Sequence, residues 1–223
     1  MRSSYRAASS VLFAAVFLAG CTPAATGGSA ASPTGTSATR PSGTGAGGGA
    51  DRAIAVGAGP QTTYTVQKQP PAGSCRFRYE KGEPLEDPVC TPGAISPAVT
   101  QSNLKSTICR KGGYTSGIRP STSVTGKEKA LNAASYGYRG SMRDAEYDHL
   151  ISLQLGGDPN DPRNLWVEPP DPGHKTGARV NNRKDPVETK LHTAVCANKI
   201  TLAAAQRAIV TDWTIALSTL GLG

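Results

Sequence analysis

Residues 147–168 read YDHLISLQLGGDPNDPRNLWVE, and this stretch decides the fold that we expect. Asp148 and His149 precede a short apolar segment, 150–155. A Gly-Gly pair and a loop rich in Asp, Pro and Asn follow, and Asn164 then opens a second short apolar segment. Two such segments separated by turn residues predict a β-hairpin with a broad loop. Pairing of the two strands would place His149 and Asn164 near the open end of the hairpin.

Helical patterns follow the hairpin. Apolar residues recur at helical spacing in 183–195, and Pro186 requires this helix to begin near 183 or 184, because proline is tolerated only in the first turn. Thr201 is the expected N-cap of a further helix over 202–217, in which Trp213 is expected to anchor the core. The predicted order is therefore strand, loop, strand, helix, with a C-terminal helix behind it.

The segments before residue 147 give weaker signals. Residues 75–120 are rich in Pro, Gly and Thr, which predicts turns between short extended pieces. The segment 123–138 is the helix-like one: 127–136 carries good helix formers, and Gly137 after it would end the helix.

The hairpin segment carries a recognisable motif. Asp148-His149 with two apolar residues, then Leu-Gly-Gly, then Asn-Asp-Pro-x-Asn164-Leu165 resembles the first two blocks of the HNH endonuclease motif. The wider pattern, over roughly 88–215, is similar to a group of exported actinobacterial HNH-like domains. The resemblance implies an α+β fold: a small disulfide-tied domain with a ββα-metal hairpin-helix core and a C-terminal helix, after a disordered N-terminal tether.

The resemblance also implies roles for individual residues. His149 would be the general base that takes a proton from the attacking water, and its ordinary pKa near 6.5 suits that role. Asp148 would be a hard oxygen ligand to one divalent ion, Mg²⁺ or else Mn²⁺ or Zn²⁺. Asn164 matches the middle asparagine of the motif, which would hold the hairpin loop or orient His149.

The third motif position fits less closely. The usual spacing falls on Pro172 or Gly173, which have no ligating side chain. Asn182, immediately before the expected helix, is the preferred third metal ligand, with Asn181 and His174 as alternatives. A cation that stabilises the phosphate is also expected, and the candidates are Arg163, Arg183 and Lys184.

The N-terminus predicts export. Arg2 and Arg6 precede a short apolar run that ends in Leu-Ala-Gly-Cys21, which resembles the lipobox of bacterial lipoproteins. We therefore expect a lipoprotein signal peptide over 1–20, lipidation of Cys21, a flexible Gly/Ser/Thr/Pro/Ala-rich tether over 21–71 and the folded domain over 72–223. The protein would be a monomer, anchored by lipid alone to the extracytoplasmic face of the cell membrane, with no evident protein partner.

Four cysteines remain: Cys75, Cys90, Cys109 and Cys196. None forms a Cys-x-x-Cys pair, which argues against a structural zinc site. An even number in an exported chain favours two disulfides, with three possible connectivities. We favour Cys75–Cys90 as a local link and Cys109–Cys196 as a long bridge.

The charge of the chain permits nucleic-acid binding without demanding it. The whole chain has a formal charge of +8, but from Cys75 onward 19 Lys and Arg minus 15 Asp and Glu leave +4. Two functions therefore stay open. The favoured one is a metal-dependent nuclease whose substrate is DNA or RNA outside the cytoplasmic membrane. The alternative is an inactive HNH-like surface module that binds a partner or a cell-envelope polymer.

Overall fold

The computed structural model describes residues 53–223 except Arg179 and Asn181. They belong to the second of two compact units, which spans Ala46–Gly223. The predicted signal peptide, Cys21 and most of the predicted tether lie outside the described residues. None of the described helices is long and apolar enough to cross a membrane.

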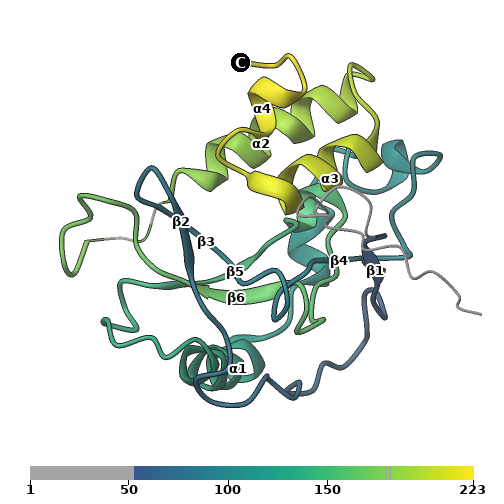
Figure 1. Ribbon diagram of the computed structural model, residues 1–223. Helices are drawn as coiled ribbons and strands as arrows, with labels where there is room; N and C mark the ends of the chain where they lie inside the picture. Colours follow the sequence, from purple (N-terminus) through teal and green to yellow (C-terminus); the bar gives the residue numbers. More distant parts are fainter. Residues whose placement is uncertain (1–52, 179, 181) are drawn as a thin grey trace, which may run out of the picture. The chain divides into compact units, whose positions relative to one another are not determined.

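The described part is a small α+β domain with four α-helices and three two-stranded sheets (Figure 1). Three 3-10 helices, Leu104–Ser106, Thr115–Ile118 and Leu153–Leu155, complete it. In chain order the elements are β1 Ala55–Val56, β2 Arg78–Glu80, β3 Glu83–Leu85, β4 Ala94–Ile95, α1 Thr122–Ser135, β5 Glu146–His149, β6 Leu165–Glu168, α2 Lys184–Cys196, α3 Leu202–Asp212 and α4 Ala216–Thr219.

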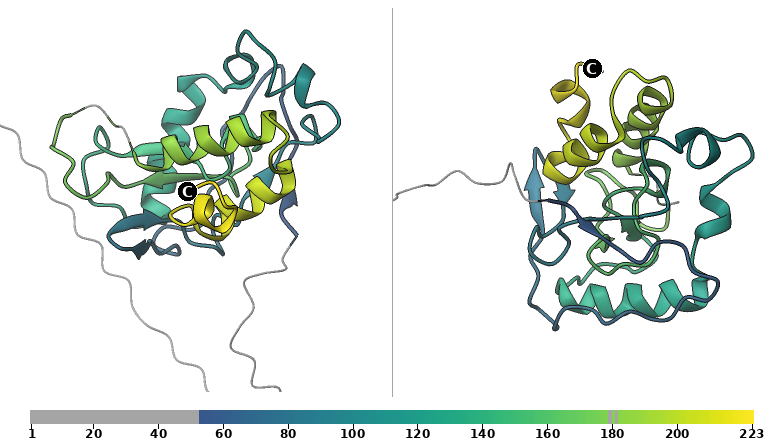
Figure 2. Two further views of the ribbon diagram at one scale, coloured as in Figure 1. Left: turned by 90° about the horizontal axis from the view of Figure 1, so that it is seen from above. Right: turned by 90° about the vertical axis from the view of Figure 1, so that its right-hand side faces the viewer.

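The β5–β6 hairpin lies between two helical layers. Its strands pair antiparallel, with Glu146 opposite Glu168 and His149 opposite Leu165. Helix α1 packs against β6 on one side, whereas α2, α3 and α4 pack together on the other side (Figures 1 and 2). The end of β5 and the start of α2 therefore meet, and this meeting point is where the expected site lies.

The apolar core has two parts. The larger one joins the helices to the segment after β5 through side chains such as Ile151, Leu191 and Ile209. The smaller one packs Tyr136 and Trp166 between α1 and β6. Apolar burial of this kind is the main favourable term in folding, and it fixes the hairpin against both helical layers.

Both disulfides are present, in the pairing that the sequence favoured. Cys75–Cys90 closes a separation of 15 residues beside the smaller core, and Cys109–Cys196 spans 87 residues and ties the end of α2 to the loop after the first 3-10 helix. In the chain-entropy account, the longer closed loop removes more freedom from the unfolded chain.

The helices confirm most of the sequence predictions. Helix α2 begins at Lys184 and has Pro186 in its first turn, and the Thr201 side chain accepts a hydrogen bond from the Ala204 amide. Trp213 is buried, as expected, and its Nε1 donates to the Pro84 carbonyl oxygen.

Helix α1, Thr122–Ser135, agrees with the predicted helical segment 123–138. One predicted helix differs. The predicted C-terminal helix over 202–217 is divided into α3 and α4, because the Asp212 carboxylate accepts hydrogen bonds from the amide and the hydroxyl of Thr214. Such local side-chain bonds compete with a continuing helix.

The first predicted strand is wrong. The paired strand is Glu146–His149, which contains the Asp-His pair, and the apolar residues 150–155 form a buried loop that ends in a 3-10 turn. His149 and Asn164 consequently lie at the loop end of the hairpin instead of its open end. The reason is tertiary: Ile151 and Leu155 belong to the core shared with α2 and α3, so they pack there instead of pairing in a sheet.

The predicted domain boundary at 72 is also too late. Residues 55–56 form β1, which pairs with β4, and the amide of Gly59 donates to Asp158 at 2.6 Å. Gly57 lies so close to Asp158 that an added Cβ would be 2.3 Å from its carboxylate. These contacts are made mostly by the backbone, so the apolar content of the sequence does not reveal them.

Candidate functional site

The candidate site is a polar pocket of about 230 Å³ at the junction of β5, the following loop and α2. Four carboxylates line it together with His149 and one guanidinium, that of Arg119. The carboxylates belong to Glu146, Asp148, Asp185 and Glu188.

His149 is held in one tautomer. Its Nε2 lies 3.1 Å from the Pro159 carbonyl oxygen, and a carbonyl oxygen only accepts, so Nε2 carries the proton. The lone pair of Nδ1 is then left as the acceptor of the ring. Burial lowers the pKa of His149 to about 4, although the neighbouring Asp148 carboxylate acts in the opposite direction. His149 is therefore a neutral imidazole at neutral pH.

Lys184 ties the end of β5 to the start of α2. Its Nζ donates to Asp148 Oδ2 at 2.6 Å, to the His149 carbonyl oxygen at 2.8 Å and to the Glu188 carboxylate. Only 1% of the residue is exposed. Burial acts to lower the pKa of Lys184, but the Asp148 and Glu188 carboxylates outweigh it and raise that pKa well above the ordinary value. The ammonium thus stays charged in the interior.

Carboxylates outnumber the cations around Lys184. We call Lys184 and its surrounding carboxylates the acidic cluster; its carboxylates are those of Glu146, Asp148, Glu168, Asp185 and Glu188. Burial, with a further contribution from Asp148, raises the pKa of Glu146 and of Glu188 to about 7, and that of Glu168 well above its ordinary value. The cluster therefore has a surplus of negative charge that protons or another cation can neutralise.

Asn182, the preferred third metal ligand, has other partners. Its Oδ1 accepts from the Asp185 amide at 3.1 Å, beside the first turn of α2, and its Nδ2 donates to Glu146 and Glu168 at 3.1 Å each. The amide thus presents its NH₂ group to the carboxylates and its oxygen to the helix. Of the two alternatives, Asn181 lies outside the described residues, and His174 Nε2 lies 3.3 Å from Asp144 Oδ1, outside the pocket lining.

Asn164 holds the loop together. Its Nδ2 donates to the carbonyl oxygens of Ile151 and Asp158, each at 3.0 Å, and its Oδ1 accepts from the Ile151 amide at 3.0 Å. Gly157 is required beside it, since an added Cβ would lie 1.7 Å from the Ile151 carbonyl oxygen. The loop-holding role is the one that these contacts favour; none of the hydrogen bonds found for the Asn164 side chain goes to His149.

The three predicted phosphate-stabilising cations have carboxylate partners. Arg163 is paired with Asp161, Arg183 with Glu83, and Lys184 with Asp148 and Glu188. The guanidinium that lines the pocket is instead that of Arg119. Sequence reasoning missed it because Arg119 precedes the motif by about thirty residues and lies in a segment without helical or strand periodicity.

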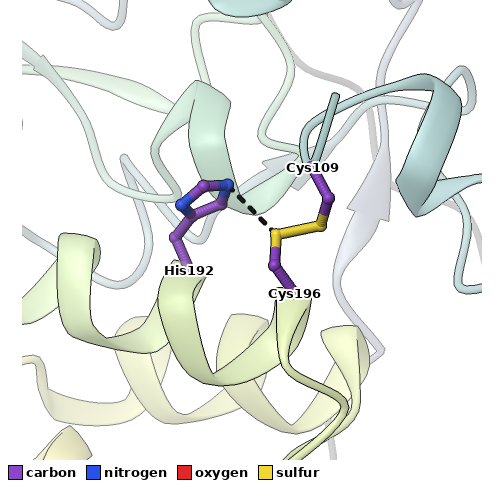
Figure 3. Close-up of side chains that lie close together, drawn as sticks. All are labelled: Cys109, His192 and Cys196. Atoms are coloured by element: carbon purple, nitrogen blue, oxygen red, sulfur yellow. Dashed lines mark hydrogen bonds between the residues drawn. A yellow bond between two sulfur atoms is a disulfide. The ribbon is translucent and has the colours of Figure 1, made fainter. Parts of the chain in front are cut away.

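A second cluster of potential metal ligands lies at the other end of α2. Donor atoms of Cys109, His192 and Cys196 lie within 4.8 Å of one another and could hold a metal ion, but the two sulfurs form a disulfide (Figure 3). His192 Nε2 also lies 3.0 Å from the Ile108 carbonyl oxygen, to which it donates. Because thiolates are the form of cysteine that binds metals, this group would become a ligand set only after reduction.

Comparisons with known proteins give no relatives: no protein-family model, no curated protein and no solved structure matches the chain. Any function therefore depends on the geometry of the site itself.

Proposed function

We propose that the chain is a metal-dependent nuclease that hydrolyses phosphodiester bonds of DNA or RNA outside the cytoplasmic membrane. The observation that carries this proposal is His149: a neutral imidazole, fixed through Nε2, in a pocket lined by carboxylates. Its position at the end of the first strand of a strand-strand-helix unit agrees with the HNH-like motif in the sequence.

In this proposal His149 Nδ1 takes a proton from the water that attacks the phosphorus. The hydrogen bond from Nε2 to Pro159 keeps Nδ1 unprotonated and fixes the ring plane. Lys184 holds the carbonyl of His149 and the carboxylate of Asp148 at the same time, and so fixes the base relative to the acidic cluster.

The donors of the acidic cluster suit a divalent metal ion in kind and in charge. Hard cations such as Mg²⁺ and Mn²⁺ prefer carboxylate oxygens, and Asp148 with Glu146, Asp185 or Glu188 would hold such an ion. Bound there, the ion would supply stabilisation of the charge on the phosphate and the leaving oxygen. Asn182 fits this role less well, because its NH₂ group faces the carboxylates.

The inactive binding module is the second candidate, and one observation favours it. The Lys184 ammonium already neutralises Asp148 and Glu188, and among the described residues no three Asp, Glu or His donor atoms lie within 4.8 Å of one another. In that case the acidic cluster would be a structural ion network, and the pocket would bind a partner without chemistry.

The test is a cleavage assay on the chain with both disulfides intact. Plasmid DNA and structured RNA are incubated with Mg²⁺, Mn²⁺ or EDTA. Wild type should cut in metal but not in EDTA, and His149→Ala should lower the rate by about 10²-fold or more, the usual contribution of a general base. His192→Ala, which removes an imidazole outside the pocket, is the matched control and should keep activity.

Folding of each variant is checked by circular dichroism and thermal unfolding. Absence of cleavage by a folded wild-type protein with any metal would reject the nuclease in favour of the binding module. Full activity in folded His149→Ala would reject the assigned base.

A further inference from the structure

We infer that Arg119 binds a phosphate group of the substrate in this pocket, as the cation that draws a phosphodiester toward His149. The inference deepens the proposed function and depends on it. It assigns a substrate contact to a residue outside the HNH-like motif.

The backbone holds Arg119 in one place beside the pocket. The residue directly follows the 3-10 helix Thr115–Ile118 and precedes Pro120, with φ −73° and ψ 136°. A residue before proline is restricted to extended conformations, so this backbone geometry is set by the sequence. Thr115 from the same short helix also lines the pocket, which makes this segment one wall of the site.

Arg119 is close to the groups that do the proposed chemistry. Its charge acts on His149, Glu146 and Asp185, in each case lowering the pKa of the group. The residue nevertheless forms no hydrogen bond or ion pair of its own with any described residue, unlike Arg163, Arg183 and Lys184. Its planar fork of N–H donors is thus available to an incoming ligand.

The charge of the pocket explains why such a cation is needed. A phosphodiester is an anion, and a pocket lined by four carboxylates repels it. A guanidinium matches phosphate oxygens in geometry and binds them in pairs, which a lone ammonium does not. Arg119 is therefore the pocket-lining group that offsets this repulsion most directly.

A buried hydroxyl in the same pocket also lacks a partner. Ser152 lines the pocket and is only 7% exposed, and its Oγ forms no hydrogen bond within the described part of the chain. Buried polar groups normally form hydrogen bonds. The Ser152 hydroxyl is therefore available to hydrogen-bond a ligand that brings oxygen atoms.

Basic side chains also lie beyond the pocket. A neighbouring open hollow of about 520 Å³ shares Glu146 and Tyr147 with the pocket and is lined by Lys129 and Arg143. A chain of several nucleotides would meet these charges after passing Arg119, whereas a single phosphate would not. The substrate class that this arrangement suits is consequently a polynucleotide.

The experiment measures binding and cleavage separately. A fluorescent single-stranded oligonucleotide is titrated by anisotropy into His149→Ala protein at several salt concentrations, with and without Arg119→Ala. Steady-state cleavage is measured for the same Arg119 substitution with His149 intact. Arg119→Lys keeps the charge without the fork, and Arg163→Ala removes an exposed arginine outside both hollows.

Arg119→Ala should weaken oligonucleotide binding by about tenfold, and in the cleavage assay the loss should be seen mainly as a rise in KM. The slope of log K against log salt concentration should fall by about 0.7, the amount expected for one lost phosphate contact on a single strand. Arg119→Lys should keep the salt slope and recover part of the affinity. Arg163→Ala should match its parent.

The two ideas fail in different ways. Wild-type cleavage with unchanged binding and KM in Arg119→Ala overturns the role of Arg119 and leaves the nuclease standing. A wild-type protein that neither cuts nor binds the oligonucleotide overturns the proposed function, and the Arg119 inference with it.

Discussion

The hydrogen bonds of Asn164, in the loop over 150–164, and the acidic cluster meet at His149, but their polar groups are satisfied to different degrees. In the loop, both polar atoms of the Asn164 side chain are used by nearby backbone groups. In the acidic cluster, five carboxylates share one buried ammonium, and the pKa values of four of them, Glu146, Glu168, Asp185 and Glu188, are raised. A fully satisfied network gives rigidity, whereas one with surplus charge retains capacity for a ligand. Under the proposed function, the Asn164 network is the support and the cluster is the region that would hold a ligand.

The largest expected effect comes from breaking the cluster at its only buried cation. Lys184→Met should lower the free energy of unfolding by on the order of 4 kcal/mol at pH 7, because it leaves buried carboxylates without a counter-charge. Urea unfolding of the oxidised protein measures it. The loss should be smaller at pH 5, since carboxylates with raised pKa values in the folded state take up protons as the pH falls.

Arg183→Met is the matched control for that experiment. Arg183 is the adjacent basic residue, and its side chain is 64% exposed although its partner Glu83 is largely buried. Its removal should therefore cost only about 1–2 kcal/mol. Equal losses for the two variants, or a Lys184→Met loss that does not depend on pH, would contradict the view that Lys184 maintains the cluster.

The loop should be the next most sensitive region. Asn164→Ala leaves the amide and carbonyl of Ile151 and the carbonyl of Asp158 without their side-chain partner, which should cost about 3 kcal/mol. The same denaturant measurement applies. Asn160→Ala, in the same loop, removes one hydrogen bond to Thr65 and should cost only about 1 kcal/mol.

Unlike the Lys184 substitution, the loss in Asn164→Ala should hardly change between pH 5 and pH 7, because the lost hydrogen bonds go to backbone amide and carbonyl groups, which do not titrate. A strong pH dependence would mean that the loop and the cluster are one network, and the comparison would fail.

The sequence predicted the helices and the disulfide pairing better than it predicted the strand, the place of the Asp-His pair in the hairpin and the cation. Helices and disulfides left local signals, such as Pro186, the Thr201 cap and an even number of cysteines. The strand was misplaced because periodicity alone does not distinguish a buried loop such as 150–155 from a buried strand. Arg119 was missed because its proximity to His149 arises from the tertiary fold, which no spacing along the chain encodes.

The smallest expected effect concerns His149, the residue at which the loop and the acidic cluster meet. The pKa of His149 falls from an ordinary 6.5 to about 4 on folding, so between these values the unfolded chain binds a proton that the folded protein does not. The contribution of His149 to stability therefore increases with pH across this window, by roughly 2 kcal/mol between pH 4.5 and 6.

The test plots the difference in unfolding free energy between wild type and His149→Gln against pH. The carboxylates of the cluster pull the other way, because raised pKa values make stability fall as the pH rises, but both proteins carry them and their effect largely cancels in the difference. A difference that stays flat from pH 4.5 to 6 would show that folding does not lower the pKa of His149, and the imidazole would then not be held neutral by its burial in the pocket as described.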